Sequence, residues 1–411
     1  MLELFPNTAA VDDAELSIGG VRATALADEF GTPVLVYCED TLRAQARAFR
    51  AIDPQALVVY GTKAFANVAL LELFASEGLG ADVSTLGELA FAQRAGIRGN
   101  RVVFHGNNKS DHELRAAAAE GALVVLDSEE EIARAAAADI EQTLLRLTPG
   151  IDAETHRSIQ TAHAESKFGI EPERALGMLT TDKPRIVGIH VHIGSQLTRA
   201  DESLAAVDEV VAFCERARAE NQWTPRIVDL GGGLGVRHST DEDVPSIDDF
   251  AGAVVRRFRE RWPHDVQLIL EPGRALIGRA GVTLYRIGST KRSGGITYVA
   301  IDGGMSDNPR PQLYGAKYEP VVANRMNEDA VATFRIAGKH CESGDVLVDA
   351  AHLPEPRRGD VLAVPATGAY TLAMASTYNG VPRPAAVLVA NGSGRLIRRR
   401  ETVDDLLAFE Q

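Results

Sequence analysis

Short apolar runs rich in β-branched residues recur through the first two thirds of the chain, and a longer stretch rich in Ala, Leu and Glu follows each of them. The runs have the length and composition of buried strands, whereas the stretches between them are typical of helices. The strand candidates begin at Leu57, Leu79, Arg101, Ala122, Thr143, Arg185, Arg226 and Gln267. Eight alternating strand and helix units over about 220 residues favour a closed (β/α)8 TIM barrel, and an open doubly wound sheet is the alternative.

The pattern changes near residue 281, where strand-like runs follow one another with only turns between them. Such spacing indicates a mainly antiparallel sheet. The runs are TLYRIG, ITYVAIDGG, ATFRIAG, DVLVDA, GDVLAVPA and AAVLVANG. Residues 21–38, which also have strand-like composition, are candidates to join this sheet. We therefore expect an α/β protein with a barrel domain of residues 37–280 and a discontinuous β-rich domain of residues 1–36 and 281–411.

The chain of 411 residues carries a formal net charge of -14, so nucleic acid and anionic membrane surfaces would repel it. It contains neither an apolar run of about 18 residues nor the pattern of a secretory leader. Its three cysteines, Cys38, Cys214 and Cys341, lack the paired spacing of a disulfide framework or a zinc site. We expect a cytoplasmic enzyme that acts on a small molecule, with no metal, nucleic acid or membrane partner.

Candidate chemistry lies at the ends of the predicted strands, where the catalytic groups of barrel enzymes are found. Lys63 ends the first run, and its ammonium would be costly to bury without a purpose, although a lysine that reaches solvent is an equally good interpretation. The seventh run ends in five residues, GGGLG (231–235), and the eighth ends in EPGR (271–274). Barrels often bind phosphate with the loops after strands seven and eight, because glycines let backbone amides approach it. A tight turn is the alternative.

Three further strand-end residues suit a pyridine cofactor. Glu271 could keep a pyridine nitrogen protonated, which makes the ring an electron sink for decarboxylation; a salt bridge to an arginine is the alternative. His190 and His192 share one face of the sixth strand, and His192, closer to the strand end, is the better candidate to stack on the ring. Ser195 could donate a hydrogen bond to the phosphate. A metal bound by the two histidines would lack a neighbouring carboxylate in the sequence.

Seven ordered motifs span nearly the whole chain: YGTKAF, HVHIGSQ, DLGGGLG, EPGR, RPQLYGA, CESGD and TGAY. Their order and spacing resemble the diaminopimelate decarboxylases, fold type III pyridoxal-phosphate-dependent enzymes that are similar to alanine racemase and ornithine decarboxylase. The resemblance implies a carboxy-lyase that converts meso-2,6-diaminopimelate to L-lysine and CO2, the last step of lysine biosynthesis, with pyridoxal 5'-phosphate as cofactor. Another basic amino acid or carboxy-polyamine decarboxylase, a racemase and a catalytically inactive relative are the alternatives.

The resemblance also implies roles for individual residues. Lys63 would form a Schiff base with the cofactor, and Cys341 would be the acid that protonates Cα. The implied cofactor-binding residues are Lys63, His192, Ser195, Gly232, Gly233, Glu271, Gly273, Arg274 and Tyr370. The implied substrate-binding residues are Arg274, Arg310, Tyr314, Glu342 and Tyr370. Arginines suit this substrate because they pair with carboxylates in bidentate geometry.

Two features of assembly are implied as well. Members of the family act as homodimers in which the CESGD segment enters the neighbouring subunit's site, and we expect the same here. Residues 152–169 resemble the family's mobile loop over the site, which we expect to close and exclude water.

Overall fold

The computed structural model describes residues 2–148 and 166–411, and these form two compact units. Unit 1 contains Met1–Ala44, Val236–Asp243 and Leu276–Gln411, and unit 2 contains Gln45–Gly235 and Val244–Ala275. Most of the segment expected to close over the site, residues 152–169, lies outside the described residues. The predicted domain boundaries between residues 36 and 37 and between 280 and 281 stay a prediction.

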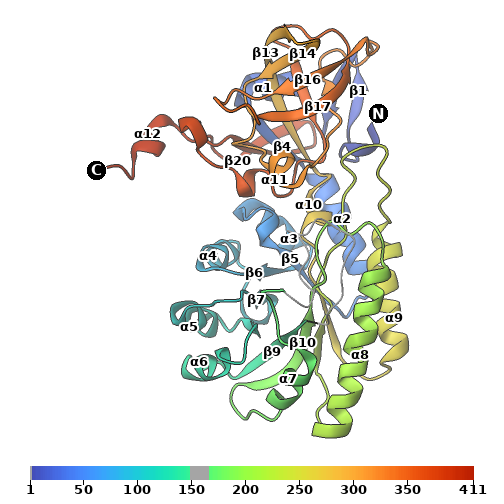
Figure 1. The fold of residues 1–411 in the computed structure, drawn as a ribbon, viewed down its shortest axis with the longest axis vertical. Coiled ribbons are helices and arrows are strands. Elements are labelled where there is room, and N and C mark those ends of the chain that lie inside the picture. Colours follow the sequence, from blue (N-terminus) through green and yellow to red (C-terminus); the bar gives the residue numbers. More distant parts are fainter. Residues whose placement is uncertain (1, 149–165) are drawn as a thin grey trace. The chain divides into compact units, whose positions relative to one another are not determined.

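Unit 2 is a closed barrel of eight parallel strands with helices around it (Figure 1). The strands are β5 (Leu57–Gly61), β6 (Gly80–Val83), β7 (Val102–Phe104), β8 (Leu123–Leu126), β9 (Gln142–Leu147), β10 (Arg185–Val191), β11 (Ile227–Asp229) and β12 (Gln267–Leu270). The last strand pairs with the first, with Ile269 opposite Leu57 and Leu270 opposite Val58. This pairing closes the barrel, so the predicted (β/α)8 architecture is confirmed and the open sheet was the wrong alternative.

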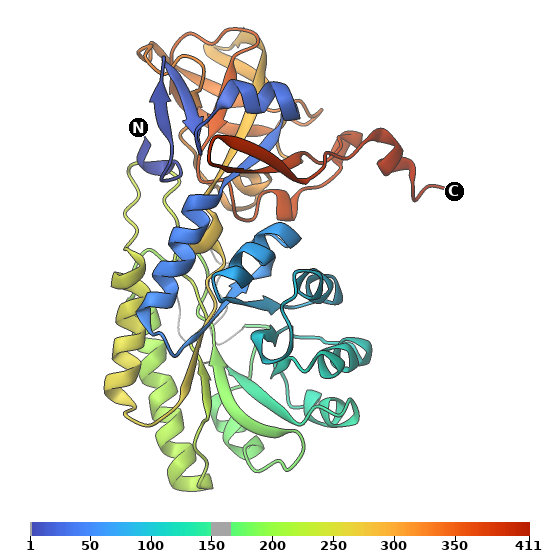
Figure 2. The same cartoon turned by 180° about the vertical axis from the view of Figure 1, so that it is seen from behind.

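The barrel helices follow their strands in sequence. They are α3 (Val68–Ser76), α4 (Leu86–Arg94), α5 (Asp111–Glu120), α6 (Glu131–Ala137), α7 (Pro172–Met178), α8 (Asp201–Asn221) and α9 (Ala253–Arg261). Asn67, Thr85 and Ser110 start α3, α4 and α5 because each side chain accepts a hydrogen bond from a backbone N–H of the first turn. Seen from behind, the green α8 and the yellow α9 lie side by side on the outside of the barrel (Figure 2).

The inside of the barrel is filled by a small apolar cluster. Its members are Val59, Val103, Val125, Leu144, Val187 and Ile269, which come from six different strands. Alternate residues of a strand face the same side, so each of these six strands contributes an inward side chain to this layer. On β10, a Cβ at Gly188 would collide with the carbonyl oxygen of Ile227, because the neighbouring strand approaches closely there. The layer below the strand ends is therefore a packed core.

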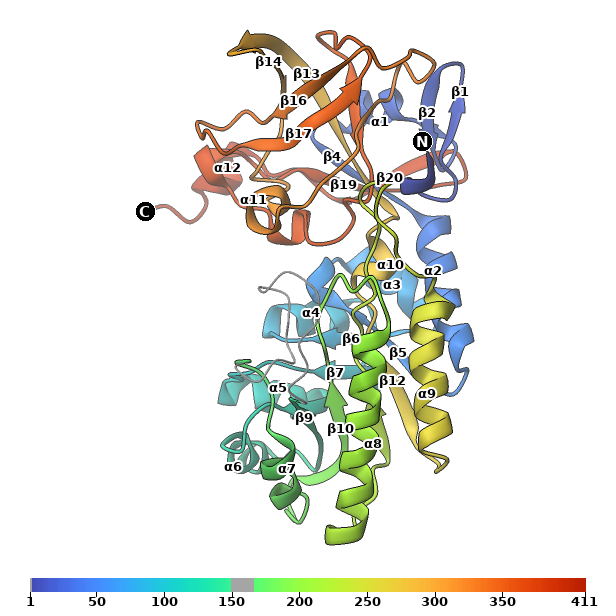
Figure 3. The same ribbon diagram turned by 45° about the vertical axis from the view of Figure 1, so that its right-hand side comes forward.

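Unit 1 contains a nine-stranded sheet and a separate three-stranded sheet. The nine strands are β4 (Val34–Cys38), β13 (Gly281–Ser293), β14 (Ile296–Ile301), β15 (Val321–Val322), β16 (Ala332–Ala337), β17 (Val346–Leu353), β18 (Val361–Val364), β19 (Ala385–Ala390) and β20 (Ser393–Arg398). Among the described pairs, β4–β19 and β14–β16 are parallel and the others antiparallel. Figure 3 shows the long neighbouring strands β16 and β17. The predicted, mainly antiparallel β region is confirmed.

Short elements complete the two units. The small sheet of unit 1 consists of β1 (Ala10–Asp12), β2 (Glu15–Ile18) and β3 (Val21–Arg22), and the other helices are α1 (Ala23–Phe30), α2 (Glu39–Ile52), α10 (Arg274–Ile277), α11 (Arg310–Tyr314) and α12 (Val403–Leu407). Single turns of other helix types are η1 (Leu2–Leu4), η2 (Thr62–Ala64), η3 (Gly99–Arg101), η5 (Asp248–Gly252), η6 (Leu372–Met374) and η7 (Tyr378–Gly380). None of the described helices combines the length and the apolar composition needed to cross a membrane.

The strand-like interpretation of residues 21–38 was right only at its two ends. Residues 23–30 form helix α1 between β3 and β4. The helix buries Ala23, Leu26 and Ala27, which are spaced three and four residues apart and therefore share one face. The prediction that this segment joins the later β sheet is nevertheless confirmed, because β4 pairs with β13 and β19.

We expect Leu144→Ala to lower the free energy of unfolding by about 2 to 5 kcal/mol, because it opens a cavity in the closed layer of the barrel. Urea unfolding followed by fluorescence would measure the shift in midpoint. Leu396→Ala is the matched control, since Leu396 on β20 is 48% exposed, and it should change stability by less than about 0.5 kcal/mol. Equal shifts for both variants would contradict the packed interior.

Candidate active site

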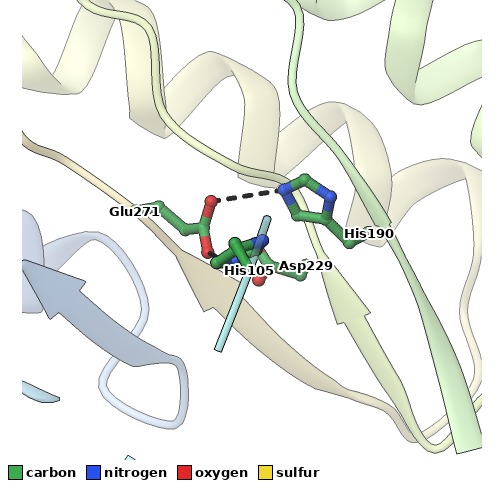
Figure 4. A group of neighbouring side chains, drawn as sticks. All are labelled: His105, His190, Asp229 and Glu271. Carbon is green, nitrogen blue, oxygen red and sulfur yellow. Dashed lines mark hydrogen bonds and ion pairs between the residues drawn. The ribbon is translucent and has the colours of Figure 1, made fainter. Parts of the chain in front are cut away.

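A buried carboxylate lies between two histidines at the carboxyl ends of the barrel strands (Figure 4). Glu271 directly follows β12, and 4% of its side chain is exposed. Its Oε1 lies 2.6 Å from Nε2 of His105, which directly follows β7, and its Oε2 lies 3.3 Å from Nε2 of His190 on β10. Since a carboxylate only accepts, each imidazole donates through Nε2–H. Both oxygens of Glu271 are thus engaged by side chains from two other strands of the barrel.

The protonation states follow from this arrangement. Burial alone would raise the pKa of Glu271, but His105 and then His190 outweigh it and hold this pKa well below its usual range. Burial also lowers the pKa of His190 to about 3, so its imidazole is neutral near neutral pH. The site therefore contains an ionised carboxylate whose partner His190 carries no charge.

Two more carboxyl groups border this pair. Asp229 on β11 is fully buried, and its pKa is raised well above the usual range, first by burial and then by the charge of Glu271. Asp82 on β6 has an oxygen 3.8 Å from Nε2 of His105. The side-chain nitrogen and oxygen atoms of four residues, His105, His190, Asp229 and Glu271, lie within 4.8 Å of one another. His190 therefore has carboxylate neighbours in the fold, although none lies near it in the sequence.

A glycine loop follows β11 and packs against the Glu271 loop. Gly231 and Gly233 have φ values of +66° and +122°, which are strained for other residues. A Cβ at Gly232 would collide with the carbonyl oxygen of Glu271, and one at Gly233 would lie 2.9 Å from the carbonyl oxygen of Gly194. The loop therefore requires glycines at three successive positions. Such backbone is suited to a phosphate group.

A basic side chain lies next to Ser195, the residue after the sixth strand that is predicted to bind the phosphate. Arg274, the first residue of α10, is buried and donates to Oγ of Ser195 from Nε at 3.3 Å and from Nη2 at 3.1 Å. Gly273, the residue before it, packs against the end of β5, where a Cβ at Gly61 would lie 3.3 Å from the Gly273 Cα. The loops after β5 and β12 are consequently adjacent.

Lys63 lies in turn η2, directly after β5, and is exposed. The pKa of His192 is lowered well below its usual range, first by burial and then by the ammonium of Lys63. His192 accepts the N–H of Gly232 at Nδ1 over 3.3 Å, and its ring is nearly parallel to that of His190, with centroids 6.5 Å apart. The structure thus brings together eight predicted residues in unit 2: Lys63, His192, Ser195, Gly232, Gly233, Glu271, Gly273 and Arg274.

The other predicted residues belong to unit 1. Arg310 starts α11 and is 4% exposed, with Nη1 donating to Nε2 of His238 and to the hydroxyl of Tyr318. Tyr314 at the end of α11 is half-buried, and its hydroxyl lies 3.9 Å from Sδ of Met374. Burial of a guanidinium among neutral partners is a feature that the sequence motif does not reveal.

The CESGD segment is an exposed loop held from behind by its aspartate. Asp345 is buried and accepts hydrogen bonds from the backbone N–H groups of Met305 and His340 and from Nδ1 of His340, at 2.6 to 2.9 Å. Cys341 and Glu342 are exposed at the tip, where Glu342 accepts from the hydroxyl of Tyr378. The loop presents its thiol and carboxylate to the outside.

Tyr370 has a φ of +59°, a left-handed conformation that is uncommon for a tyrosine. Such a backbone persists only where surrounding structure holds it, and it is found preferentially at functional positions. The backbone of TGAY is therefore unusual at the residue predicted to touch both cofactor and substrate.

Several residues of the site were missed by sequence reasoning. His105 and Asp229 lie at the ends of strands that had been predicted, so a polar residue after an apolar run was the available signal. Arg146 on β9 is another polar residue within an apolar run, and its Nη1 lies 3.5 Å from Oδ1 of Asp127. His238 and Tyr318 lie in loops without any such pattern.

Comparison with known proteins extends the similarity over both units. The family model described as pyridoxal-dependent decarboxylase, pyridoxal binding domain, matches residues 39–278. Diaminopimelate decarboxylase of Bacillus subtilis (strain 168) is 40% identical over 417 residues, covering 96% of this chain and 95% of that protein. The enzyme of the same name from Actinosynnema pretiosum subsp. auranticum is 42% identical over 428 residues, covering 99% and 95%. The crystal structure of diaminopimelate decarboxylase from M. jannaschii in complex with L-lysine has a TM-score of 0.91 at 31% identity and covers 98% of both chains.

The low pKa of His190 makes stability depend on pH. Between about pH 6.5 and pH 3 the unfolded chain binds a proton at this position and the folded chain does not, so stability falls as the pH drops from 6.5. We expect His190→Asn to reduce the stability lost between pH 7 and pH 5 by about 1 to 2 kcal/mol, measured by urea unfolding at both pH values. His112→Asn, on the exposed side of α5, should leave the loss unchanged. An undiminished loss in His190→Asn would contradict burial of a neutral imidazole.

Proposed function

This chain belongs to the pyridoxal-dependent decarboxylases, and we propose that it decarboxylates meso-diaminopimelate at the D-centre to give L-lysine and CO2. It is a lyase that uses pyridoxal 5'-phosphate. The observation that carries the substrate assignment is the identity of 40 to 42% with diaminopimelate decarboxylases over 96 to 99% of the chain. This similarity includes both units, and therefore both groups of predicted site residues.

The residues of unit 2 fit the cofactor. Pyridoxal phosphate supplies an electron sink for the pair of electrons left on Cα when CO2 departs. The glycine loop 231–233, which has no room for side chains, would hold the phosphate with Ser195 and Arg274. Lys63 would bind the cofactor covalently through Nζ, and His192 would stack on its ring.

Glu271 would hold a proton at the ring nitrogen. This needs an ionised carboxylate in a buried site, and the two imidazoles of His105 and His190 provide it by hydrogen bonds. His190 contributes its bond without adding a second charge, because its own pKa is about 3. The negative charge thus remains available to a positively charged group.

The residues of unit 1 would bind the substrate and return the proton. Arg310 would bind the distal carboxylate, and Glu342 would bind the distal ammonium. Tyr314 and Tyr370 would contact the substrate, and Tyr370 the cofactor as well. Cys341 would deliver its Sγ proton to Cα after CO2 has left. The exposure of Cys341 and Glu342 supports a role at an intermolecular site.

We further propose that the enzyme is a cytoplasmic homodimer with shared active sites, in which the CESGD loop of one subunit serves the other. The support is the motif resemblance together with the exposed tip of this loop. The net charge of -14 favours a small-molecule enzyme over one that binds nucleic acid or membrane.

Incubation of the cofactor-loaded protein with meso-diaminopimelate should release CO2 and form L-lysine, as measured by chromatography of the products. L,L-diaminopimelate is the matched control for the stereocentre and should yield no lysine. Turnover of ornithine or arginine in place of diaminopimelate would contradict the substrate assignment.

Two inactive variants should together test both the residue roles and the shared site. Lys63→Ala should lose the visible absorption band of the bound cofactor, whereas Cys341→Ala should keep the band, and each should lose nearly all activity. If subunits share sites, co-expression of the two should restore about one quarter of the wild-type activity, since half of the dimers then contain one intact site of two. Persistence of the band in Lys63→Ala would contradict the cofactor assignment. Absence of restored activity in isolated mixed dimers would contradict sharing.

A further inference from the structure

Arg310 is a buried cation without a carboxylate beside it. It is 4% exposed, and within the part of the chain that the structure describes no Asp or Glu lies within 4.0 Å of its guanidinium. Its backbone is fixed at the start of α11, where its N–H donates to Oδ1 of Asn308 over 3.3 Å. A buried charge without a counterion is expensive, so the protein retains it only where something repays that cost.

Two neutral groups hold one end of the guanidinium. Nη1 of Arg310 donates to Nε2 of His238 over 2.9 Å and to the hydroxyl of Tyr318 over 2.7 Å. His238 and Tyr318 are each 3% exposed, and their rings meet edge to face with centroids 5.6 Å apart. The anchor is therefore a packed, buried pair that fixes where Nη1 lies.

The tautomer of His238 is also determined. Because arginine can only donate, Nε2 of His238 must accept, and its ring proton is on Nδ1. Nδ1 lies 3.6 Å from Oε2 of Glu242, and the same oxygen accepts the backbone N–H of His238 over 2.7 Å. Glu242 thus fixes the backbone of His238, and its carboxylate lies on the Nδ1 side of the imidazole, beyond hydrogen-bond distance.

The opposite edge of the guanidinium has the geometry of a carboxylate site. Nε of Arg310 is buried and, among the described residues, has no hydrogen-bond partner. Nε and Nη2 form the second edge of the fork, whose two parallel N–H groups match the two oxygens of a carboxylate. His238 and Tyr318 satisfy Nη1 without neutralising the guanidinium, so its positive charge remains available for pairing with a carboxylate at that second edge.

We infer that His238 and Tyr318 are positioning residues that orient Arg310 toward the distal carboxylate of the substrate and thereby select substrates that carry it. This inference rests on the role proposed above for Arg310. It adds a specificity determinant from residues 236–243, the segment that follows the glycine loop in sequence and belongs to unit 1.

The test compares ligands with and without the carboxylate. L-lysine retains the distal carboxylate of the substrate, and cadaverine differs from L-lysine only by lacking it. We expect Tyr318→Phe to raise the KM for meso-diaminopimelate and the inhibition constant of L-lysine about five- to tenfold, because a hydrogen bond to a charged group is lost. The kcat should change less than about twofold. The inhibition constant of cadaverine should not change.

Position 238 provides a second variant with a conservative rescue. His238→Ala should raise the inhibition constant of L-lysine as Tyr318→Phe does. His238→Gln should restore part of the lost affinity, since a side-chain amide oxygen can accept a hydrogen bond from Nη1 of Arg310. If His238 and Tyr318 had only a structural role, their variants would change kcat and the inhibition constants of both L-lysine and cadaverine together.

The chain offers a matched control in a similar arginine and tyrosine pair. The hydroxyl of Tyr298 accepts from Nη1 of Arg335, whose Cζ lies 5.7 Å from the ring, compared with 5.8 Å for Arg310 and Tyr318. Arg335 also pairs with Asp349, so its charge has a counterion. Tyr298→Phe should leave KM, kcat and both inhibition constants unchanged.

Arg310→Ala separates failure of the inference from failure of the proposed function. An unchanged KM in Arg310→Ala would overturn the role proposed for Arg310 itself. A raised KM in Arg310→Ala, with unchanged values in Tyr318→Phe and His238→Ala, would overturn only the positioning inference. Equal weakening of L-lysine and cadaverine would overturn it as well.

Discussion

Glu271 carries a negative charge although only 4% of its side chain is exposed. The rest of the site in unit 2 depends on the contacts that keep this buried carboxylate ionised. A lone buried carboxylate would take up a proton. His105 and His190 prevent this, and they arrive from β7 and β10, which are not neighbours of β12 in the barrel. A closed ring of parallel strands, with all carboxyl ends on one side, brings these three strand ends to one point. The packed layer of Val, Leu and Ile side chains below them keeps those ends in place.

The same physical device occurs with opposite sign in unit 1. Arg310 is a buried cation held by His238 and Tyr318, just as Glu271 is a buried anion held by imidazoles. In both cases hydrogen bonds with imidazole or hydroxyl groups orient the charge and satisfy part of its hydrogen-bonding capacity. An oppositely charged partner would instead cancel it. Under the proposed function, the remaining charge would be available to a protonated ring nitrogen in one unit and to a carboxylate in the other.

The predicted site divides along the two units, and the physical demands on its parts differ. The residues of unit 2 follow the ends of buried strands and are held by backbone contacts, as the glycine loop shows where it packs against Glu271. The CESGD loop of unit 1 has its thiol and its carboxylate exposed, while Asp345 secures the loop from the inside. Rigid positioning suits a cofactor, whereas an exposed tip suits a group supplied to another surface.

Sequence alone determined those features that rest on local periodicity and residue type. The eight barrel strands, the later strands of the β region and the strand-end positions of Lys63, His192 and Glu271 follow from apolar runs and from the polar residues that end them. Local composition misled at residues 23–30, where a buried face with helical spacing produced α1 inside a strand-like segment. Partners were decided only by the tertiary structure: His105 and Glu271 are 166 residues apart, and His238 and Arg310 are 72 apart. Such contacts arise from barrel closure and from the packing of unit 1, so no local pattern can encode which imidazole meets which charge.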